Sequence, residues 1–73
     1  MLDRLTPREK EVAKLVGQCF TNYAIGVHLG LREGTVKLHV HHILDKLNIR
    51  TRTQLAVMLI DYEAQRARTV PVN

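Results

Sequence analysis

The 73-residue chain is long enough for one small domain and too short to build a large catalytic cleft. Its composition, with 45% hydrophobic and 25% charged residues, is that of a folded globular protein, and its net charge of +4 suggests a polyanionic partner. The single cysteine, Cys19, excludes both an internal disulfide and a cysteine zinc site.

A capping signal opens the first predicted helix. Thr6 and Glu9 have the spacing of a capping box, and Pro7 lies at the first helical position, where its missing N–H is not needed. The apolar residues that follow recur with helical spacing, so we expect them to form the buried stripe of this helix: Val12, Leu15 and Val16.

A short second helix is predicted from Thr21-Asn22 to Gly30. Thr21 can cap its start, and Gly30 can take the left-handed conformation that ends a helix. Ile25 and Leu29 are four residues apart and are expected to face the core. Only a tight linker, residues 31–33, separates this helix from the next.

The third predicted helix runs from Glu33 to Leu47. Five apolar residues fall within about 100° of one another on a helix of 3.6 residues per turn, and they are expected to face the core: Val36, Val40, Ile43, Leu44 and Leu47. Asn48 follows, a residue that tolerates a left-handed C-terminal turn.

The core stripe forces the other side chains of the third helix outward. Residues 32–52 carry five basic residues against two acidic ones, so the charge excess of the chain gathers here. A helix in the DNA major groove needs donors for base edges and an apolar surface for a thymine methyl, and Lys37, Leu38 and His41 supply both. Four further residues are expected to face phosphates: Thr35, His39, His42 and Lys46. The second and third helices together have helix-turn-helix geometry.

Other interpretations stay open on the residues alone. A charged outer face is usually only solvated, and helix-turn-helix pairs occur in proteins that never bind DNA. His39 and His42 share a face, but no further ligand completes a metal site, so no metal or cofactor is predicted. Cys19 has no base and orienting group beside it in a pocket, so no enzymatic activity is predicted.

A second capping box, Thr51 to Gln54, opens a fourth helix that is predicted to end near Gln65. Its apolar residues are consecutive, so one face cannot bury them all. The face expected to pack on the domain holds Leu55, Met58, Leu59 and Tyr62. The opposite face has the spacing of a helix-pair seam and is predicted to form a symmetric dimer: Thr53, Val57, Ile60 and Ala64. Residues 67–73 are expected to be a frayed tail.

No segment predicts a membrane helix. The longest apolar run, Leu55 to Ile60, is six residues, far short of the roughly 20 residues of a membrane span. The N-terminal sequence MLDRLTPREK has no hydrophobic signal core. We therefore expect a cytoplasmic protein without a membrane partner.

Five motifs resemble, in their order and spacing, the LuxR/FixJ-type (NarL/GerE-like) helix-turn-helix DNA-binding domain. They are LTPREKEV (5–12), TN..I...L (21–29), TVKLHV (35–40), IL.KL (43–47) and R.R.QLA (50–56). The resemblance covers roughly residues 5–62. It implies an all-α, four-helix domain over residues 1–66, whose third helix recognises double-stranded DNA and whose fourth forms a homodimer. It further implies a transcription regulator, either free-standing or the output domain of a response regulator with a separate receiver or sensor domain. A protein-interaction module that does not use DNA remains the alternative.

The resemblance also assigns positions. Lys37, Leu38 and His41 fall at its base-contacting positions; Thr35, His39 and Lys46 fall near phosphates, Asn22 falls at a further backbone-contact position, and Arg50 is a weaker candidate.

Three residues depart from the family pattern. Family members usually have a serine near Arg32 and glycines where Cys19 and Asn48 stand. Arg32 cannot cap as serine does, so it is expected either to change the helix start or to contact a phosphate instead. A left-handed Cys19 would cost about 1–2 kcal/mol, so either the first helix ends by another geometry or the domain accepts that strain.

Overall fold

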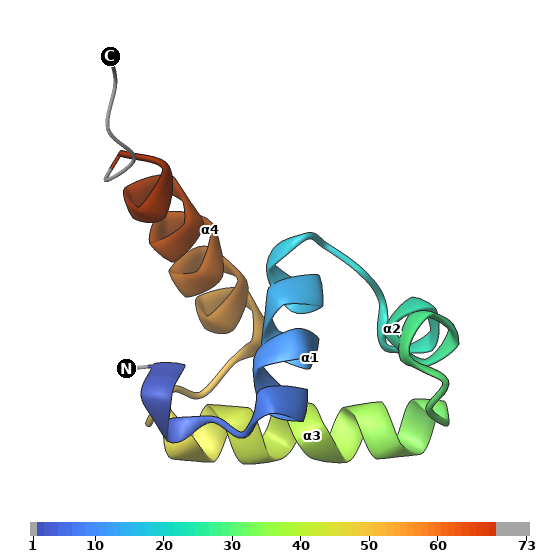
Figure 1. The fold of residues 1–73 in the computed structure, drawn as a ribbon. Coiled ribbons are helices and arrows are strands. Elements are labelled where there is room, and N and C mark those ends of the chain that lie inside the picture. Colours follow the sequence, from blue (N-terminus) through green and yellow to red (C-terminus); the bar gives the residue numbers. More distant parts are fainter. Residues whose placement is uncertain (1, 69–73) are drawn as a thin grey trace.

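The computed structural model describes residues 2–68, which form a short 3₁₀ turn and four α-helices (Figure 1). The elements in chain order are η1 (Leu2–Arg4), α1 (Pro7–Gly17), α2 (Asn22–Leu29), α3 (Glu33–Lys46) and α4 (Arg52–Arg68). No strand occurs in this part of the chain. The all-α, four-helix class predicted from the sequence is confirmed, whereas η1 was not predicted.

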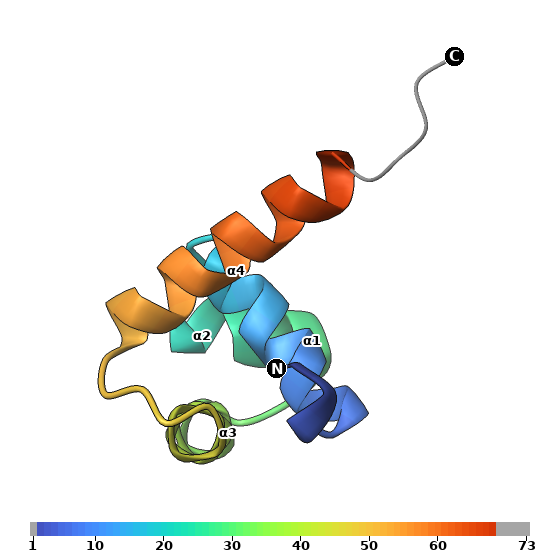
Figure 2. The same cartoon turned by 90° about the vertical axis from the view of Figure 1, so that its left-hand side faces the viewer.

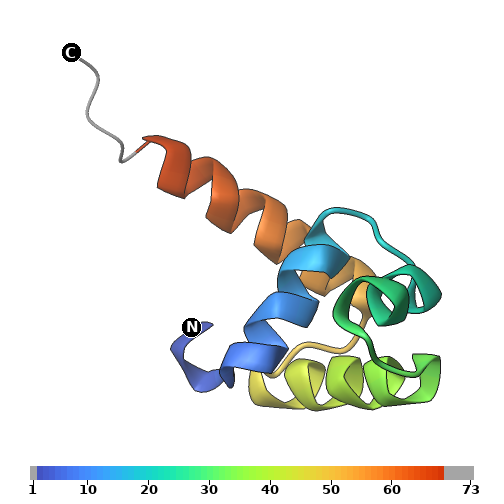
Figure 3. The same ribbon diagram turned by 45° about the vertical axis from the view of Figure 1, so that its right-hand side comes forward.

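The helix α1 lies at the centre of the arrangement. It packs against both α3 and α4, while α2 packs against α3 near that helix's N-terminal end (Figure 1). Seen along the axis of α3, the other helices all lie to one side of it (Figure 2). The C-terminal half of α4 extends away from the rest of the domain (Figure 3). Within residues 2–68, one face of α3 and one face of α4 are therefore left without a neighbouring helix.

The core consists of the apolar stripes expected from the helical spacing. The buried apolar side chains are Leu5, Val12, Ala13, Leu15, Val16, Ile25, Val36, Val40, Ile43, Leu55 and Leu59. Leu29, Leu44, Leu47 and Met58 are half-buried and pack against this cluster. The α1–α4 contact is close at Gly17, because a Cβ there would lie 2.6 Å from the Cβ of Leu59. Only a residue without a side chain fits this contact.

Both predicted capping boxes are present. The Thr6 N–H donates to Oε1 of Glu9 over 2.9 Å, and the Glu9 N–H donates to Oγ1 of Thr6 over 3.1 Å. Thr51 and Gln54 repeat this exchange at the start of α4, over 3.0 and 3.1 Å. These bonds satisfy backbone donors that a helix leaves unpaired at its first turn.

Each of the helices α1, α2 and α3 is followed by a residue whose backbone has the left-handed conformation: Cys19 (φ 68°), Gly30 (φ 72°) and Asn48 (φ 55°), respectively. The apolar residue that follows then donates its N–H to a carbonyl five residues back, which closes the helix. These bonds are Phe20 to Leu15 (3.0 Å), Leu31 to Gly26 (2.8 Å) and Ile49 to Leu44 (3.0 Å). The predictions for Gly30 and Asn48 are confirmed. For Cys19, the second alternative holds, because the residue is left-handed and its strain is accepted.

The end of α4 differs from the prediction. The helix continues to Arg68, three residues beyond Gln65, so residues 67 and 68 are helical and were wrongly assigned to the tail. Ala and Arg are strong helix formers, and no glycine or proline interrupts this stretch, which explains the extension. The rest of the expected tail, residues 69–73, lies outside the described residues, as does Met1.

Candidate nucleic-acid interface

The turn between α2 and α3 fixes the angle of the helix-turn-helix pair. A Cβ on Gly26 would lie 2.5 Å from the carbonyl oxygen of Leu31, so the helix and the turn approach more closely than any side chain permits. The N–H of Leu31 donates back to the carbonyl of Gly26 over 2.8 Å. Gly26 is thus required by a backbone contact, which sets how α3 leaves the turn.

The free face of α3 carries the residues predicted to read DNA. Lys37, Leu38 and His41 are exposed, and Leu38 has 54% of its surface in solvent although it is apolar. Thr35 and His42 are exposed beside them, whereas His39 is half-buried at the flank. In Figure 1 both α1 and α2 lie above α3, so the opposite side of α3 is not covered by either helix. The structure therefore brings the three predicted base readers onto one accessible surface.

His41 has a neighbour on its own helix. Its Nε2 lies 3.5 Å from Oδ2 of Asp45, one turn further along, and both side chains are about 70% exposed. Its ring centroid lies 6.2 Å from that of His42. The spacing of four residues was the sequence signal for the contact with Asp45. An exposed pair of this kind contributes little to stability, so His41 is free to leave it for another partner.

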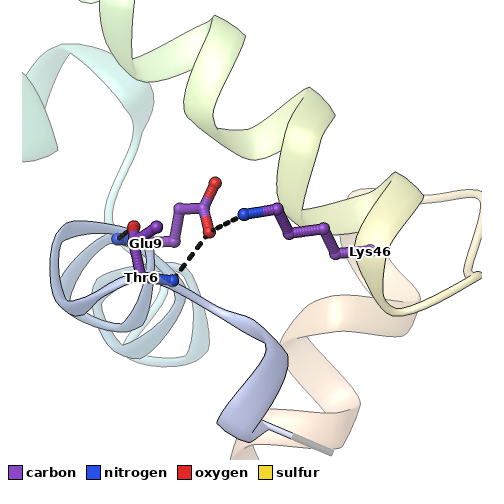
Figure 4. A network of polar contacts seen from close by, with 3 residues as sticks. All are labelled: Thr6, Glu9 and Lys46. Carbon is purple, nitrogen blue, oxygen red and sulfur yellow. Dashed lines mark hydrogen bonds and ion pairs between the residues drawn. The ribbon is translucent and has the colours of Figure 1, made fainter.

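Lys46 lies on the inner flank of α3, where it meets a buried carboxylate (Figure 4). Its Nζ donates to Oε1 of Glu9 over 2.7 Å, and the Glu9 side chain is only 6% exposed. Burial alone would raise the pKa of Glu9, but the hydrogen bonds from Lys46 and from the Thr6 backbone outweigh it, so this pKa lies below its ordinary value of 4.5. From the sequence Glu9 was predicted only as a capping residue. Its hydrogen bond with Lys46 was not predicted, because the two residues are 37 positions apart and no local sequence pattern indicates the contact.

Arg52 joins the start of α4 to the start of α2. Its Nη1 donates to Oδ1 of Asn22, and its Nη2 donates to the backbone carbonyl of Phe20. Arg52 and Asn22 are both half-buried. The sequence predicted Asn22 as a phosphate contact but gave no role to Arg52. The long arginine side chain thus links two helix starts that are 30 residues apart in the sequence.

The remaining predicted contacts lie at the two ends of α3. Arg32 is the residue before the helix, and its side chain makes no capping hydrogen bond. The expectation that Arg32 does not cap as serine would is therefore confirmed, and its exposed guanidinium remains available. Arg50 is exposed, and its backbone N–H donates to Oε1 of Gln54 over 2.8 Å.

The predicted dimer seam lies on α4, on the side opposite the core. Thr53, Val57, Ile60 and Ala64 are all exposed, and Val57 and Ile60 have 59% and 55% of their surface in solvent. A hollow of about 310 Å³ next to Val57 is lined by Cys19, Phe20 and Thr53 among others. The seam and the free face of α3 lie on different helices, so one need not block the other.

Two other properties concern residues 2–68 only. No three histidine, cysteine or acidic side chains of this segment gather closely enough to hold a metal ion. No helix within it combines the length and the apolar character needed to cross a membrane.

Comparison with known proteins identifies the family. The profile described as "Bacterial regulatory proteins, luxR family" matches residues 3–59. The chain belongs to the luxR family. It is 44% identical to the two-component response regulator PprB of Pseudomonas aeruginosa over 59 residues, which is 81% of this chain and 22% of PprB. It is 41% identical to the nitrate/nitrite response regulator NarL of Escherichia coli K12 over 56 residues, 77% of this chain and 26% of NarL.

A third relative, the transcriptional regulatory protein LnrK of Bacillus subtilis, is 45% identical over 58 residues, 80% of this chain and 26% of LnrK. The luxR-family chain thus spans about a quarter of the length of these relatives. The family is described as one of regulatory proteins, PprB and NarL are named response regulators, and LnrK is named a transcriptional regulatory protein, which agrees with the prediction of a regulator and not an enzyme. The resemblance found in the five sequence motifs is confirmed.

Proposed function

We propose that this luxR-family domain binds double-stranded DNA sequence-specifically, with α3 in the major groove, and thereby regulates transcription. The observation that carries the proposal is the free face of α3, where the apolar Leu38 is exposed between Lys37 and His41. Lys37 donates to base edges, Leu38 packs on a thymine methyl, and His41 donates or accepts according to its protonation. Membership of a family of bacterial regulatory proteins supports the same conclusion.

The proposal assigns phosphate contacts to the residues around this face. They are Asn22, Arg32, Thr35, His39, His42, Lys46 and Arg50. Lys46 has three N–H donors and gives one to Glu9, so it can contact a phosphate without leaving the carboxylate. Because bacterial DNA lies in the cytoplasm, the proposed activity would also be cytoplasmic.

We further propose a homodimer formed through Thr53, Val57, Ile60 and Ala64 of α4. Their exposure and their spacing of four, three and four residues support a helix-pair seam. A two-fold dimer would place two copies of α3 on two half-sites of one operator. Because the seam side chains are mostly small, the dimer is expected to form more readily on DNA than in free solution.

The relatives suggest how the activity is controlled. PprB and NarL are named response regulators, and the segment shared with this chain is only 22% of PprB and 26% of NarL. We propose that this domain is the output part of such a system, whose DNA binding a receiver or sensor domain controls.

A binding assay on duplex DNA tests the proposed function. The 73-residue chain is titrated against labelled random-sequence and selected duplexes at several salt concentrations. The log of affinity should fall with the log of salt by about 0.9 per neutralised phosphate, and a preferred sequence should emerge. Lys37→Ala should relax that preference, while Lys14→Ala, an exposed lysine on α1, serves as the matched control. A flat salt response without sequence preference would instead favour a module that binds protein only.

A further inference from the structure

The guanidinium of Arg52 donates two hydrogen bonds to acceptors at the start of α2. One terminal nitrogen donates to Oδ1 of Asn22 and the other to the carbonyl of Phe20. These two acceptors stand two residues apart, on either side of Thr21, whose hydroxyl caps the N–H of Ala24 over 3.1 Å. The planar guanidinium presents its N–H groups in a fixed fork, so it holds both acceptors in one geometry.

This contact fixes which way the Asn22 amide points. Arginine has donors and no acceptor, so the oxygen of Asn22 must face it and the Nδ2 group must face the other way. Nδ2 has no hydrogen-bond partner in the described part of the chain. No buried side-chain nitrogen or oxygen there lacks a partner, so the Nδ2 group reaches solvent. The two N–H donors of Asn22 Nδ2 therefore reach solvent, and their direction is fixed by the bond between Arg52 and the amide oxygen.

We propose that Arg52 is a positioning residue for DNA binding, which holds the Asn22 amide so that its Nδ2 donates to a phosphate oxygen. The inference rests on the proposed function and deepens it. In this proposal Arg52 acts through Asn22, because its half-buried guanidinium directs both terminal nitrogens at Asn22 and at the Phe20 carbonyl. A preset amide also loses less side-chain freedom on binding than one that must first be ordered.

A double-mutant cycle tests this role. Affinity for the selected duplex is measured for the full chain, for Asn22→Ala, for Arg52→Met and for the double variant, each over a series of salt concentrations. Asn22→Ala should weaken binding about tenfold, the size expected for one hydrogen bond to a charged group. Arg52→Met should weaken binding by a similar factor, and the double variant should be no weaker than Asn22→Ala alone.

Two readouts separate positioning from other roles. If Arg52 contacts a phosphate directly, Arg52→Met lowers the salt slope by about 0.9 and its effect adds to that of Asn22→Ala, which overturns the inference. If Arg52 only supports the loop through Phe20, its effect persists in full in the Asn22→Ala background, which also overturns it. A salt slope unchanged by both substitutions, together with a non-additive cycle, supports the inference.

A second variant, Asn22→Asp, separates a loss of DNA binding from a loss of folding. Asn22→Asp keeps an oxygen for Arg52 but has no N–H to donate, so it should melt no lower than the unsubstituted chain and still bind DNA at least tenfold more weakly. If Asn22→Asp binds DNA as tightly as the unsubstituted chain, the inference is overturned while the proposed function stands. Absence of any DNA binding by the unsubstituted chain would overturn the proposed function, and this inference with it.

Discussion

Lys46, near the end of α3, donates a 2.7 Å hydrogen bond to the carboxylate of Glu9 in the first turn of α1. The same oxygen of Glu9 also accepts the N–H of Thr6, so one atom serves both the helix cap and the contact between helices (Figure 4). The pair therefore links the start of α1 to the helix proposed to read DNA.

Removing the lysine should destabilise the domain. Lys46→Met leaves the Glu9 carboxylate buried with one donor fewer, which should lower the free energy of unfolding by about 1–3 kcal/mol. The effect stays below that of a fully buried pair because Lys46 is itself 39% exposed. Urea unfolding measures it. The control is Lys10→Met, an exposed lysine of α1, which should change stability by about 0.5 kcal/mol at most. Equal effects of the two substitutions would contradict the structural role of the pair.

Acid should weaken the domain through Glu9. Its pKa in the folded state lies below the ordinary 4.5, so its stabilising effect is complete above that pH and is lost as the pH falls through the folded value. Glu9→Gln keeps an oxygen for Thr6 but does not titrate, so it should be less stable at neutral pH and show a shallower loss on acidification. Thermal melts from about pH 6 to pH 3 measure both slopes. Parallel slopes would show that Glu9 does not carry this dependence.

Alanine at two glycines should have opposite effects. Gly26→Ala places a Cβ against the Leu31 carbonyl and should cost about 1–3 kcal/mol of stability. Gly34→Ala, in the first turn of α3, meets nothing within 4 Å and should stabilise by about 0.5–1 kcal/mol, because alanine is the better helix former. Chemical denaturation of the two variants gives the comparison. A neutral Gly26→Ala would mean that the turn relaxes around the new methyl group.

Glycine should relieve strain at the end of α1 more than at the end of α3. Cys19 and Asn48 are both left-handed, but asparagine tolerates that conformation through local hydrogen bonds and cysteine does not. Cys19→Gly should raise stability by up to about 1 kcal/mol, after the entropy that glycine adds to the unfolded chain. Asn48→Gly should change it less. If the order is reversed in denaturant unfolding, strain at Cys19 is not a significant cost.

A charge in the α4 seam should separate dimerisation from DNA contact. Val57→Asp places a carboxylate where the proposed dimer buries a methyl pair, so binding to a two-half-site duplex should weaken by tenfold or more, about 1.4 kcal/mol, while binding to a single half-site is unchanged. Sedimentation of the DNA complex measures the number of bound chains. Gln65→Glu adds one negative charge on the same helix outside the seam and serves as the control. Two chains bound by the Val57→Asp variant would contradict the seam.

The features predicted from the sequence are those that local rules determine. The capping boxes at Thr6 and Thr51 and the buried stripe of α3 depend on residues within a few turns of one another, so spacing alone was sufficient. The contacts that organise the interface join distant positions. Glu9 and Lys46 are 37 residues apart, and Asn22 and Arg52 are 30 apart. The helical periodicity of the sequence does not predict such pairs, because they form only when the helices pack together.

The end of α4 was underestimated for a related reason. Sequence patterns locate a helix end by a stop signal, and the segment after Gln65 has none before Pro71. Among the candidate site residues, Lys37, Leu38 and His41 were brought together on one face, since a single helix carries them all. Their contacts with bases stay a prediction.

The projecting end of α4 has a consequence for dynamics. Leu59 is the last buried residue of this helix, and Tyr62 is half-buried, so the turns from Ile60 to Arg68 bury less side-chain surface than the turns before them. A helix segment of this length has little stability alone in water. Amide protons there should exchange quickly in an isolated chain and become protected when a second helix packs along the seam. Hydrogen exchange at the end of α4 would then report assembly directly, residue by residue.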